Sequence, residues 1–259
     1  MTDLVTSSIS DGVATILLND PDKLNALSPR MIEQLIAALD HADREARVII
    51  LSGAGRAFCA GANLADDAAS PDEGADGGEV LEKFYNPMVR RIRDLHIPLI
   101  TRVRGPAAGV GAVLAWMGDV VVASDTAYFL QPFHRIGLIP DAGAPFVLVR
   151  TVGRVRALQL MLLGEKLPAA RALEWGLITR VTTDDELDEV AAGHAASLAA
   201  GATFALGNIR RLAWAASEGT LEDELVLERA LQRETTLKSD FKEGLAAFLE
   251  KRPARFTGQ

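Results

Sequence analysis

The sequence has few of the residues that would point to several large classes of protein. Its 259 residues include a single cysteine, Cys59, so no disulfide can form within the chain, and that favours a reducing compartment. Aromatic residues make up only 5% of the chain, and its 27 lysines and arginines are outnumbered by 35 aspartates and glutamates. The resulting net charge of −8 argues against nucleic acid as the main partner.

Long apolar runs and targeting signals are also missing. The longest uncharged stretch of small and apolar residues, Gly105–Gly118, is too short to span a bilayer and is typical of a core helix. The N-terminal residues do not have the pattern of a secretory signal, and the four histidines lack metal-ligand spacing. We therefore expect a cytoplasmic protein with no membrane partner and no bound metal.

The pattern of apolar residues predicts an α/β front half. Two alternating runs, Leu4–Ile9 and Val13–Leu18, flank Ser10-Asp11-Gly12 and predict a hairpin. Ser28-Pro29 predicts the start of a helix, and the next strand, Val48–Leu51, implies a parallel pair joined by a right-handed crossover. Further strands are expected at Ile97–Val103, Asp119–Ala123, Ala127–Leu130 and Ile178–Val181, and further helices at Val80–Leu95, Arg154–Leu163 and Ala169–Trp175.

The rest of the chain reads as helical. Thr183-Asp184-Asp185-Glu186 has the spacing of a capping box, and helices are expected from there to about residue 200 and at 204–217, 221–238 and 241–250. This predicts a core unit, residues 1–200, and a helical C-terminal region, residues 201–259. Asp66–Glu79, acidic and rich in glycine and alanine, predicts a mobile surface loop that is either a lid or a tolerated insertion.

Two loops of small residues each follow a predicted strand. Gly105–Ala112 runs into a helix, and Ser52–Leu64 follows Val48–Leu51. Small residues let backbone N–H groups approach a ligand, and the first N–H groups of a helix lack partners and carry partial positive charge. The loops can therefore each offer an N–H to an oxygen that becomes negative, although close packing without a ligand is the alternative. Neither loop fits a phosphate-loop or dinucleotide pattern.

These loops resemble the signature of the crotonase (enoyl-CoA hydratase/isomerase) superfamily. The matching segments occur in the family's order along nearly the whole chain: Leu18–Leu27, Ala57–Leu64, Gly105–Ala112, Asp240–Gly244 and Ala247–Arg252. The resemblance implies a β/β/α spiral with a C-terminal helical region that assembles trimers, often paired into hexamers.

The resemblance also implies a site for acyl-CoA thioesters, in which coenzyme A is part of the substrate and no separate cofactor is needed. The thioester oxygen is held between two backbone N–H groups, which match Ala62 and Val110. Lys23 and Arg56 match positions near the CoA phosphates, although a solvated surface charge is the alternative for Lys23 and for Lys251. The remaining assignments are the backbone of Asn25, Ala26 and Ala60 near the adenine; Gly61, Asn63, Leu64, Tyr85, Gly109 and Phe133 in the substrate site; and Phe248 and Lys251 reaching CoA from a neighbouring subunit.

The acid/base residues decide the reaction. Hydratases of the family carry glutamates at the positions of Val113 and Phe133, so efficient water addition is not expected here. Asp141 matches the catalytic aspartate of a subset of the family, and its neighbours Phe129, Leu130, Phe133, Ile136, Leu138 and Ile139 predict a desolvating wall that raises its pKa. The alternative is a Pro-Asp turn that caps a helix at Ala142–Arg150, and both roles are compatible.

The sequence therefore predicts an acyl-CoA isomerase that shifts a double bond in an enoyl-CoA or isomerises a ring epoxide, as in a phenylacetate-degrading branch of the family. A single carboxylate suffices, because it can take a proton from one carbon and return it to another. Two alternatives stay open: a hydratase-type lyase and a non-catalytic acyl-CoA-binding protein. Tyr85, Phe84, Phe129 and Phe133 suggest a bulky or aromatic acyl group but fit a core equally well.

Overall fold

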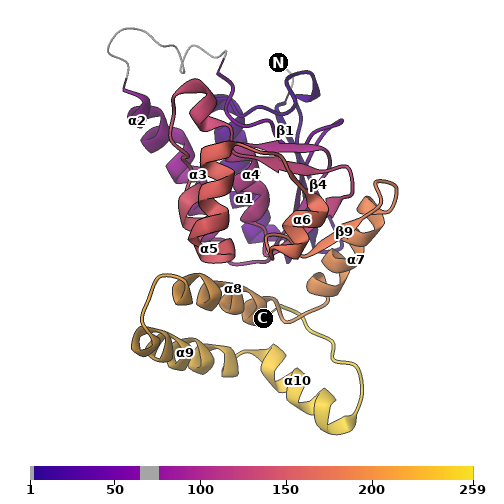
Figure 1. Cartoon of the computed structure of the whole chain (residues 1–259). Coiled ribbons are helices and arrows are strands. Elements are labelled where there is room, and N and C mark those ends of the chain that lie inside the picture. Colours follow the sequence, from indigo (N-terminus) through magenta and orange to yellow (C-terminus); the bar gives the residue numbers. More distant parts are fainter. Residues whose placement is uncertain (1–2, 65–75, 259) are drawn as a thin grey trace.

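The computed structural model describes residues 3–64 and 76–258 (Figure 1). Its main sheet has six strands in the order β1-β2-β3-β4-β6-β9, and a second sheet has three strands in the order β5-β7-β8. The strands of the main sheet are parallel except for the antiparallel pair β1 and β2. They span Val5–Ser10 (β1), Val13–Leu18 (β2), Val48–Gly53 (β3), Leu99–Val103 (β4), Val120–Ser124 (β6) and Arg180–Thr182 (β9).

The first three strands confirm the predicted hairpin and parallel pair. Asp11 and Gly12 both have positive φ, 52° and 76°, which is the backbone of a tight hairpin turn. A short 3-10 helix, η1 (Pro21–Lys23), precedes α1 (Pro29–Glu45). The hydroxyl of Ser28 accepts a hydrogen bond from the N–H of Met31 at 3.2 Å, as expected of an N-cap. After α1 the chain returns as β3, parallel to β2.

The smaller sheet and a buried helix that follows its first strand lie within the core. The second sheet consists of β5 (Pro106–Ala108), β7 (Tyr128–Leu130) and β8 (Leu167–Pro168). Helix α4 (Val110–Trp116) follows β5 directly, and all seven of its residues are buried. The core of the chain therefore surrounds the helix whose first turn is the predicted oxyanion site.

The helix that follows the undescribed stretch begins earlier than predicted. The carboxylate of Asp76 accepts a hydrogen bond from the N–H of Gly78 at 2.8 Å and caps α2 (Gly77–Val80). The π-helical turn η3 (Leu81–Tyr85) and α3 (Asn86–Arg93) continue it. The prediction of a loop as far as Glu79 is therefore wrong at its end, because Asp76 supplies an N-cap. Residues 66–75 of that predicted loop lie outside the described residues.

The next helices follow the predicted pattern with one correction. Helix α5 (Ala144–Leu163) is interrupted at Gly153, with φ 77° and ψ 162°, near the predicted break. A 3-10 helix, η4 (Phe133–Ile136), precedes it, and α6 (Ala169–Glu174) follows. The predicted capping box is wrong: α7 (Leu187–Ala199) starts after Glu186 with no side-chain cap, because that carboxylate accepts hydrogen bonds from the hydroxyls of Thr182 and Thr183.

Three C-terminal helices, α8 (Thr203–Ala216), α9 (Leu221–Thr236) and α10 (Ser239–Glu250), lie beside the core as a separate layer (Figure 1). The turn before α8 falls at the predicted boundary after residue 200, and the division into two units stays a prediction. Arg210 of α8 is buried, and its guanidinium donates to Asp119 at 2.8 Å and to the carbonyls of Ile92, Arg93 and Leu95. Arg210 thus helps to anchor the helical layer to the core, as does Arg47, which donates to Thr203 and to the carbonyls of Gly201 and Phe256.

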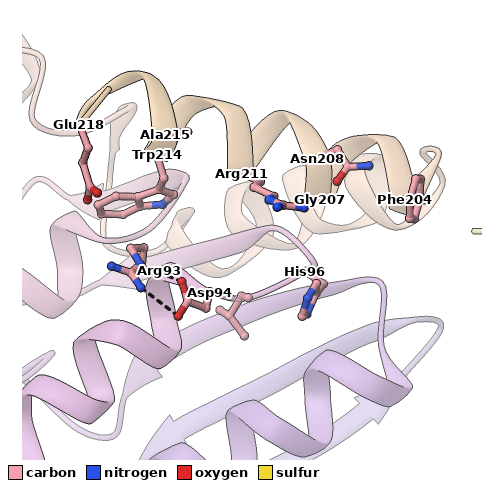
Figure 2. A pocket seen from close by; sticks show the side chains of 11 residues that line it. Arg93, Asp94, His96, Phe204, Gly207, Asn208, Arg211, Trp214, Ala215 and Glu218 are labelled. Carbon is pink, nitrogen blue, oxygen red and sulfur yellow. Dashed lines mark hydrogen bonds and ion pairs between the residues drawn. The ribbon is translucent and has the colours of Figure 1, made fainter. Parts of the chain in front are cut away.

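A hollow of about 450 Å³ remains between α8 and the end of α3 (Figure 2). Arg93 and Asp94 form an ion pair on one wall, and Arg211 and Trp214 belong to the opposite wall. No single helix among the described residues is both long and apolar enough to cross a membrane. Within those residues, α7 and α8 reach the length and apolar composition of a membrane span only when they are taken together, and the pair is bent by 108°.

Candidate active site

The two small-residue loops are joined to each other by main-chain hydrogen bonds. Cys59 and Ala107 form a parallel bridge, in which Cys59 N–H donates to the Pro106 carbonyl at 3.2 Å and Ala108 N–H donates to the Cys59 carbonyl at 2.9 Å. The segment after β3 thus becomes an extra strand beside β5. Two loops whose bonded residues Cys59 and Pro106 are 47 positions apart in sequence are therefore held side by side.

Two glycines let the loops approach more closely still. Gly61 and Gly109 have φ values of 102° and 53°, which side chains other than glycine rarely adopt. A Cβ on Gly61 would lie 3.8 Å from the Cα of Gly109 and 2.8 Å from the carbonyl oxygen of Ala108. The residues that follow these glycines, Ala62 and Val110, therefore lie on closely approaching loops, and the oxyanion hole that they would form stays a prediction.

The N–H groups of these two residues are available to a ligand. Val110 is the first residue of α4, where an N–H has no partner within the helix and the helix dipole is positive. In the loop around Ala62, the N–H groups of Leu27 and Asn63 donate to neighbouring carbonyls, and the N–H of Ala62 has no such partner in the described part of the chain. The arrangement suits an oxygen that becomes negative during a reaction.

Asn25 works through its side chain, a role that sequence reasoning missed. Its buried amide donates to the carbonyls of Ala54, Ala57 and Phe58 at 2.9, 2.8 and 3.3 Å and accepts from Asp20 N–H at 2.9 Å. This amide ties the N-terminal turn to the first loop.

The main-chain donors of the predicted adenine site are already used. Asn25 N–H donates to Asp20, Ala26 N–H to Lys23, and Ala60 N–H to Leu24. An adenine at this position would therefore contact carbonyl oxygens, which accept hydrogen bonds from its amino group.

The predicted CoA-binding cations lie on the surface, and part of the predicted set lies far from the loops. Lys23 and Arg56 are exposed at the turns beside Asn25 and the first loop, and Leu64 is exposed at the end of that loop. Phe248 is 80% exposed on α10, and Lys251 ends that helix, so within one chain both belong to the outer helical layer (Figure 1). Tyr85 is buried, and its hydroxyl donates to the Leu27 carbonyl at 3.4 Å, next to Ala62.

Asp141 has an unpaired carboxylate oxygen. Its Oδ1 is buried without a hydrogen-bond partner in the described structure, and burial raises the pKa of Asp141 from 3.8 to about 6. The predicted helix cap is wrong, because the N-cap of α5 is Gly143 and no side chain caps the helix. Only the main-chain carbonyl of Asp141 contacts the first turn, accepting from Ala144 N–H at 2.9 Å.

The predicted apolar wall needs correction. Ile136, Leu138 and Ile139 are 56%, 52% and 82% exposed, so they do not bury Asp141. The 3-10 helix η4 ends at Gly137 with φ 73°, and the chain beyond it follows the surface until position 140. Phe129 is fully buried in the core against Trp116, with ring centroids 5.4 Å apart.

No carboxylate occupies the two positions where hydratases carry glutamate. Val113 is fully buried within α4, and Phe133 is buried at the start of η4. The Phe133 ring lies against the glycine turn, since a Cβ on Gly109 would be 3.5 Å from its outermost carbon. The turn is therefore bordered by an aromatic ring at the position where a hydratase places an acid. Among the described residues, no group of three or more histidine, cysteine, aspartate or glutamate side chains could hold a metal ion.

Gln131 is the second residue that sequence reasoning did not assign. Its amide nitrogen donates to the Gly109 carbonyl at 3.1 Å, and the side chain is buried. The only available signal was a polar residue placed directly after the apolar strand Tyr128–Leu130.

The profile of the family described as Enoyl-CoA hydratase/isomerase matches residues 8–259. Together with the spiral of two sheets and the paired glycine loops, this match shows that the chain belongs to the enoyl-CoA hydratase/isomerase family, the crotonase superfamily, and is an enzyme that acts as an acyl-CoA isomerase or hydratase.

Individual relatives carry names from both activities. The chain is 43% identical to the 1,2-epoxyphenylacetyl-CoA isomerase of Escherichia coli, over 100% of both chains. It is also 43% identical to a Rhodobacter capsulatus protein named "Probable enoyl-CoA hydratase", covering 97% of this chain and 96% of that one. Among solved structures, an enoyl-CoA hydratase from Polaromonas superposes with a TM-score of 0.90 at 33% identity, covering 97% and 99% of the two chains.

Proposed function

We propose that the protein is an acyl-CoA isomerase in which Asp141 is the single acid/base. The observation that carries this proposal is the buried, unpaired Oδ1 of Asp141, on a chain that has valine and phenylalanine at the two positions where hydratases carry glutamate. A pKa of about 6 suits a group that accepts a proton in one step and returns it in the next.

The proposed reaction uses one N–H from each loop. The thioester oxygen lies between the N–H groups of Ala62 and Val110, which stabilise its negative charge as an enolate forms. The carboxylate of Asp141 removes a proton from the acyl chain, and the electron pair moves through the enolate to the thioester oxygen. When the enolate collapses, Asp141 returns the proton to a different carbon, so the double bond shifts and no water is added.

The substrate is an acyl-CoA ester that has a double bond or a ring epoxide near the thioester. The first relative, an isomerase of 1,2-epoxyphenylacetyl-CoA by name, supports the ring-epoxide class. The aromatic side chains of Tyr85 and Phe133 line this region in the proposal, with Leu64 and Asn63 at its entrance. No resident cofactor takes part, because coenzyme A belongs to the substrate.

The proposed assembly is a trimer, alone or paired into a hexamer. Support comes from the apolar side chains that α10 exposes, among them Phe241, Leu245, Phe248 and Leu249. In such an assembly Phe248 and Lys251 contact the CoA bound to a neighbouring subunit, while Lys23 and Arg56 contact its phosphates.

Two other functions give different experimental results. A hydratase-type lyase, which the names of several relatives favour, would add water to crotonyl-CoA despite the side chains at positions 113 and 133. A non-catalytic acyl-CoA-binding protein would bind CoA esters and release no α-proton.

The deciding experiment follows deuterium exchange in D₂O at the α-carbon of 3-enoyl-CoA and at the γ-carbon of 2-enoyl-CoA, the two positions whose deprotonation gives the same dienolate. We expect the native enzyme to exchange and to interconvert the two isomers, and Asp141→Asn to lose about 10²- to 10⁴-fold of both rates. Asp125→Asn, an exposed aspartate after β6, is the matched control and should keep full activity. Hydration of crotonyl-CoA that survives Asp141→Asn would overturn the proposal.

A further inference from the structure

The second oxyanion donor belongs to a peptide group whose other end is held by a side chain. The N–H of Val110 and the carbonyl of Gly109 are parts of one planar trans peptide, so they point in opposite directions. Any contact that fixes the direction of the carbonyl therefore fixes the direction of the N–H. The Gly109 carbonyl accepts its hydrogen bonds from protein groups, so the N–H of the same peptide points away from those groups.

Leu130 and Gln131 hold Gly109 from both sides. The carbonyl of Leu130 accepts the Gly109 N–H at 2.8 Å, and the amide nitrogen of Gln131 donates to the Gly109 carbonyl at 3.1 Å. The N–H groups of Ala112 and Val113 reach the same carbonyl at 3.1 and 3.3 Å, as part of the first turn of α4. Leu130, at the end of β7, and the next residue, Gln131, thus position the start of α4, whose first residue carries the second oxyanion donor.

Of the two polar atoms of the Gln131 side-chain amide, the nitrogen has a hydrogen-bond partner among the described residues and the oxygen has none. Because the Gly109 carbonyl is an acceptor, the nitrogen of Gln131 must face it, and the oxygen must face away. That oxygen is buried without a partner among the described residues, although the whole side chain is only 1% exposed. A buried unsatisfied acceptor is unfavourable, and methionine would fill the same space without it. Packing alone does not account for glutamine at this position.

We propose that Gln131 is a positioning residue of the oxyanion hole. By binding the Gly109 carbonyl, it directs the Val110 N–H at the thioester oxygen, and the polarised peptide becomes a stronger donor. The inference rests on the proposed function, since it assumes that a thioester oxygen lies between Ala62 and Val110. It adds a side chain that touches neither the substrate nor the other donor.

The test compares Gln131→Met with Thr101→Val. The hydroxyl of Thr101 is buried and donates to the Ala115 carbonyl at 2.7 Å, so the control removes the same kind of bond from the opposite end of α4. The two readouts are the isomerase kinetics and the carbonyl stretch of an unreactive saturated acyl-CoA bound to each protein. Binding to a polarising oxyanion hole lowers that frequency relative to the free thioester.

We expect Gln131→Met to lower kcat about 10- to 100-fold with KM within about twofold, since a misdirected donor removes an interaction made mainly in the transition state. Its bound carbonyl frequency should move back towards that of the free thioester, while Thr101→Val keeps the native frequency and kcat. A native frequency in Gln131→Met, or an equal loss in both variants, would overturn this inference and leave the proposed function standing. A native enzyme that does not polarise the thioester would overturn the proposed function itself.

Discussion

The two loops that supply the oxyanion donors are held in place in different ways. In the first loop, the carbonyl of Gly61, which shares a peptide with the Ala62 N–H, accepts from the Leu27 N–H at 2.7 Å. In the second loop, the matching carbonyl of Gly109 accepts from the N–H groups of Ala112 and Val113 and also from the side chain of Gln131. The first donor is thus positioned by main chain against main chain, and the second partly by one side chain.

This difference decides which substitutions can change the direction of each donor N–H. A main-chain bond survives most side-chain changes, so the direction of the Ala62 N–H depends on the path of the backbone. That path is set by Asn25, whose amide contacts the loop from behind. The direction of the Val110 N–H depends on the first turn of α4 and, in addition, on the side chain of Gln131, which a single substitution can remove.

The largest effect is expected where the two loops touch. A Cβ on Gly111 would lie 2.3 Å from the main-chain oxygen of Cys59 and 2.8 Å from its sulfur. Because a backbone atom cannot be moved by choosing another rotamer, Gly111→Ala should separate the loops and lower the free energy of unfolding by about 3 kcal/mol or more.

Gly193→Ala is the matched control for that change, and urea unfolding measures both. It is the same substitution within a helix, α7, with no atom near the new Cβ. It should therefore raise the free energy of unfolding by about 0.5–1 kcal/mol. Equal stability of the two variants would show that the loops are not in contact as described.

The next prediction compares Asn25, whose side chain holds the first loop, with Gln131, whose side chain holds the second. Asn25→Ala leaves three carbonyls, two of them buried, without their donor and should lower the free energy of unfolding by about 2–3 kcal/mol. Gln131→Met removes one bond and also removes an unsatisfied oxygen, so it should cost less than about 1 kcal/mol. Chemical denaturation of both variants measures this. A larger loss in Gln131→Met would contradict the view that Gln131 serves direction more than stability.

Local patterns predicted most of the fold. The alternation on both sides of Asp11-Gly12 gave the hairpin, and Ser28-Pro29 marked the start of α1, since both signals depend on residues that are neighbours in sequence. The predicted break before Arg154 agrees with the kink at Gly153 for the same reason. Errors arose where a polar side chain had two possible partners: Glu186 binds two hydroxyls instead of capping α7, and Asp76 caps a helix inside a predicted loop.

The site was less predictable from local sequence. The two glycine loops were recognised by their composition, and the structure places Gly61 beside Gly109. Asn25 and Gln131 were not recognised as supports, because their partners are 29–33 and 22 residues away and nothing local specifies them. The orientation of Ile136–Ile139 was also missed, since an apolar run does not show which of its side chains face solvent.

A stability effect of opposite sign to those of Gly111→Ala and Asn25→Ala comes from Asp141, which belongs to neither loop. Burial raises the pKa of Asp141 from 3.8 to about 6, so the folded protein holds this proton more tightly than the unfolded chain does. Stability from this group is therefore complete below pH 4 and is lost as the pH rises through about 6. The difference between the two pKa values corresponds to about 3 kcal/mol, which screening of the partly exposed carboxylate reduces to about 1–2 kcal/mol.

Asp141→Asn should consequently stabilise the protein while it abolishes exchange, in contrast to changes in either loop. Thermal or urea unfolding should show a gain of about 1–2 kcal/mol at pH 7 that disappears near pH 4, where the native carboxyl is neutral as well. The exchange rate of the native enzyme should rise with pH and level off above about pH 6, because the proton-accepting form is the carboxylate. A change in stability that does not vary with pH would show that Asp141 is solvated and that ionising its carboxyl does not lower the free energy of unfolding.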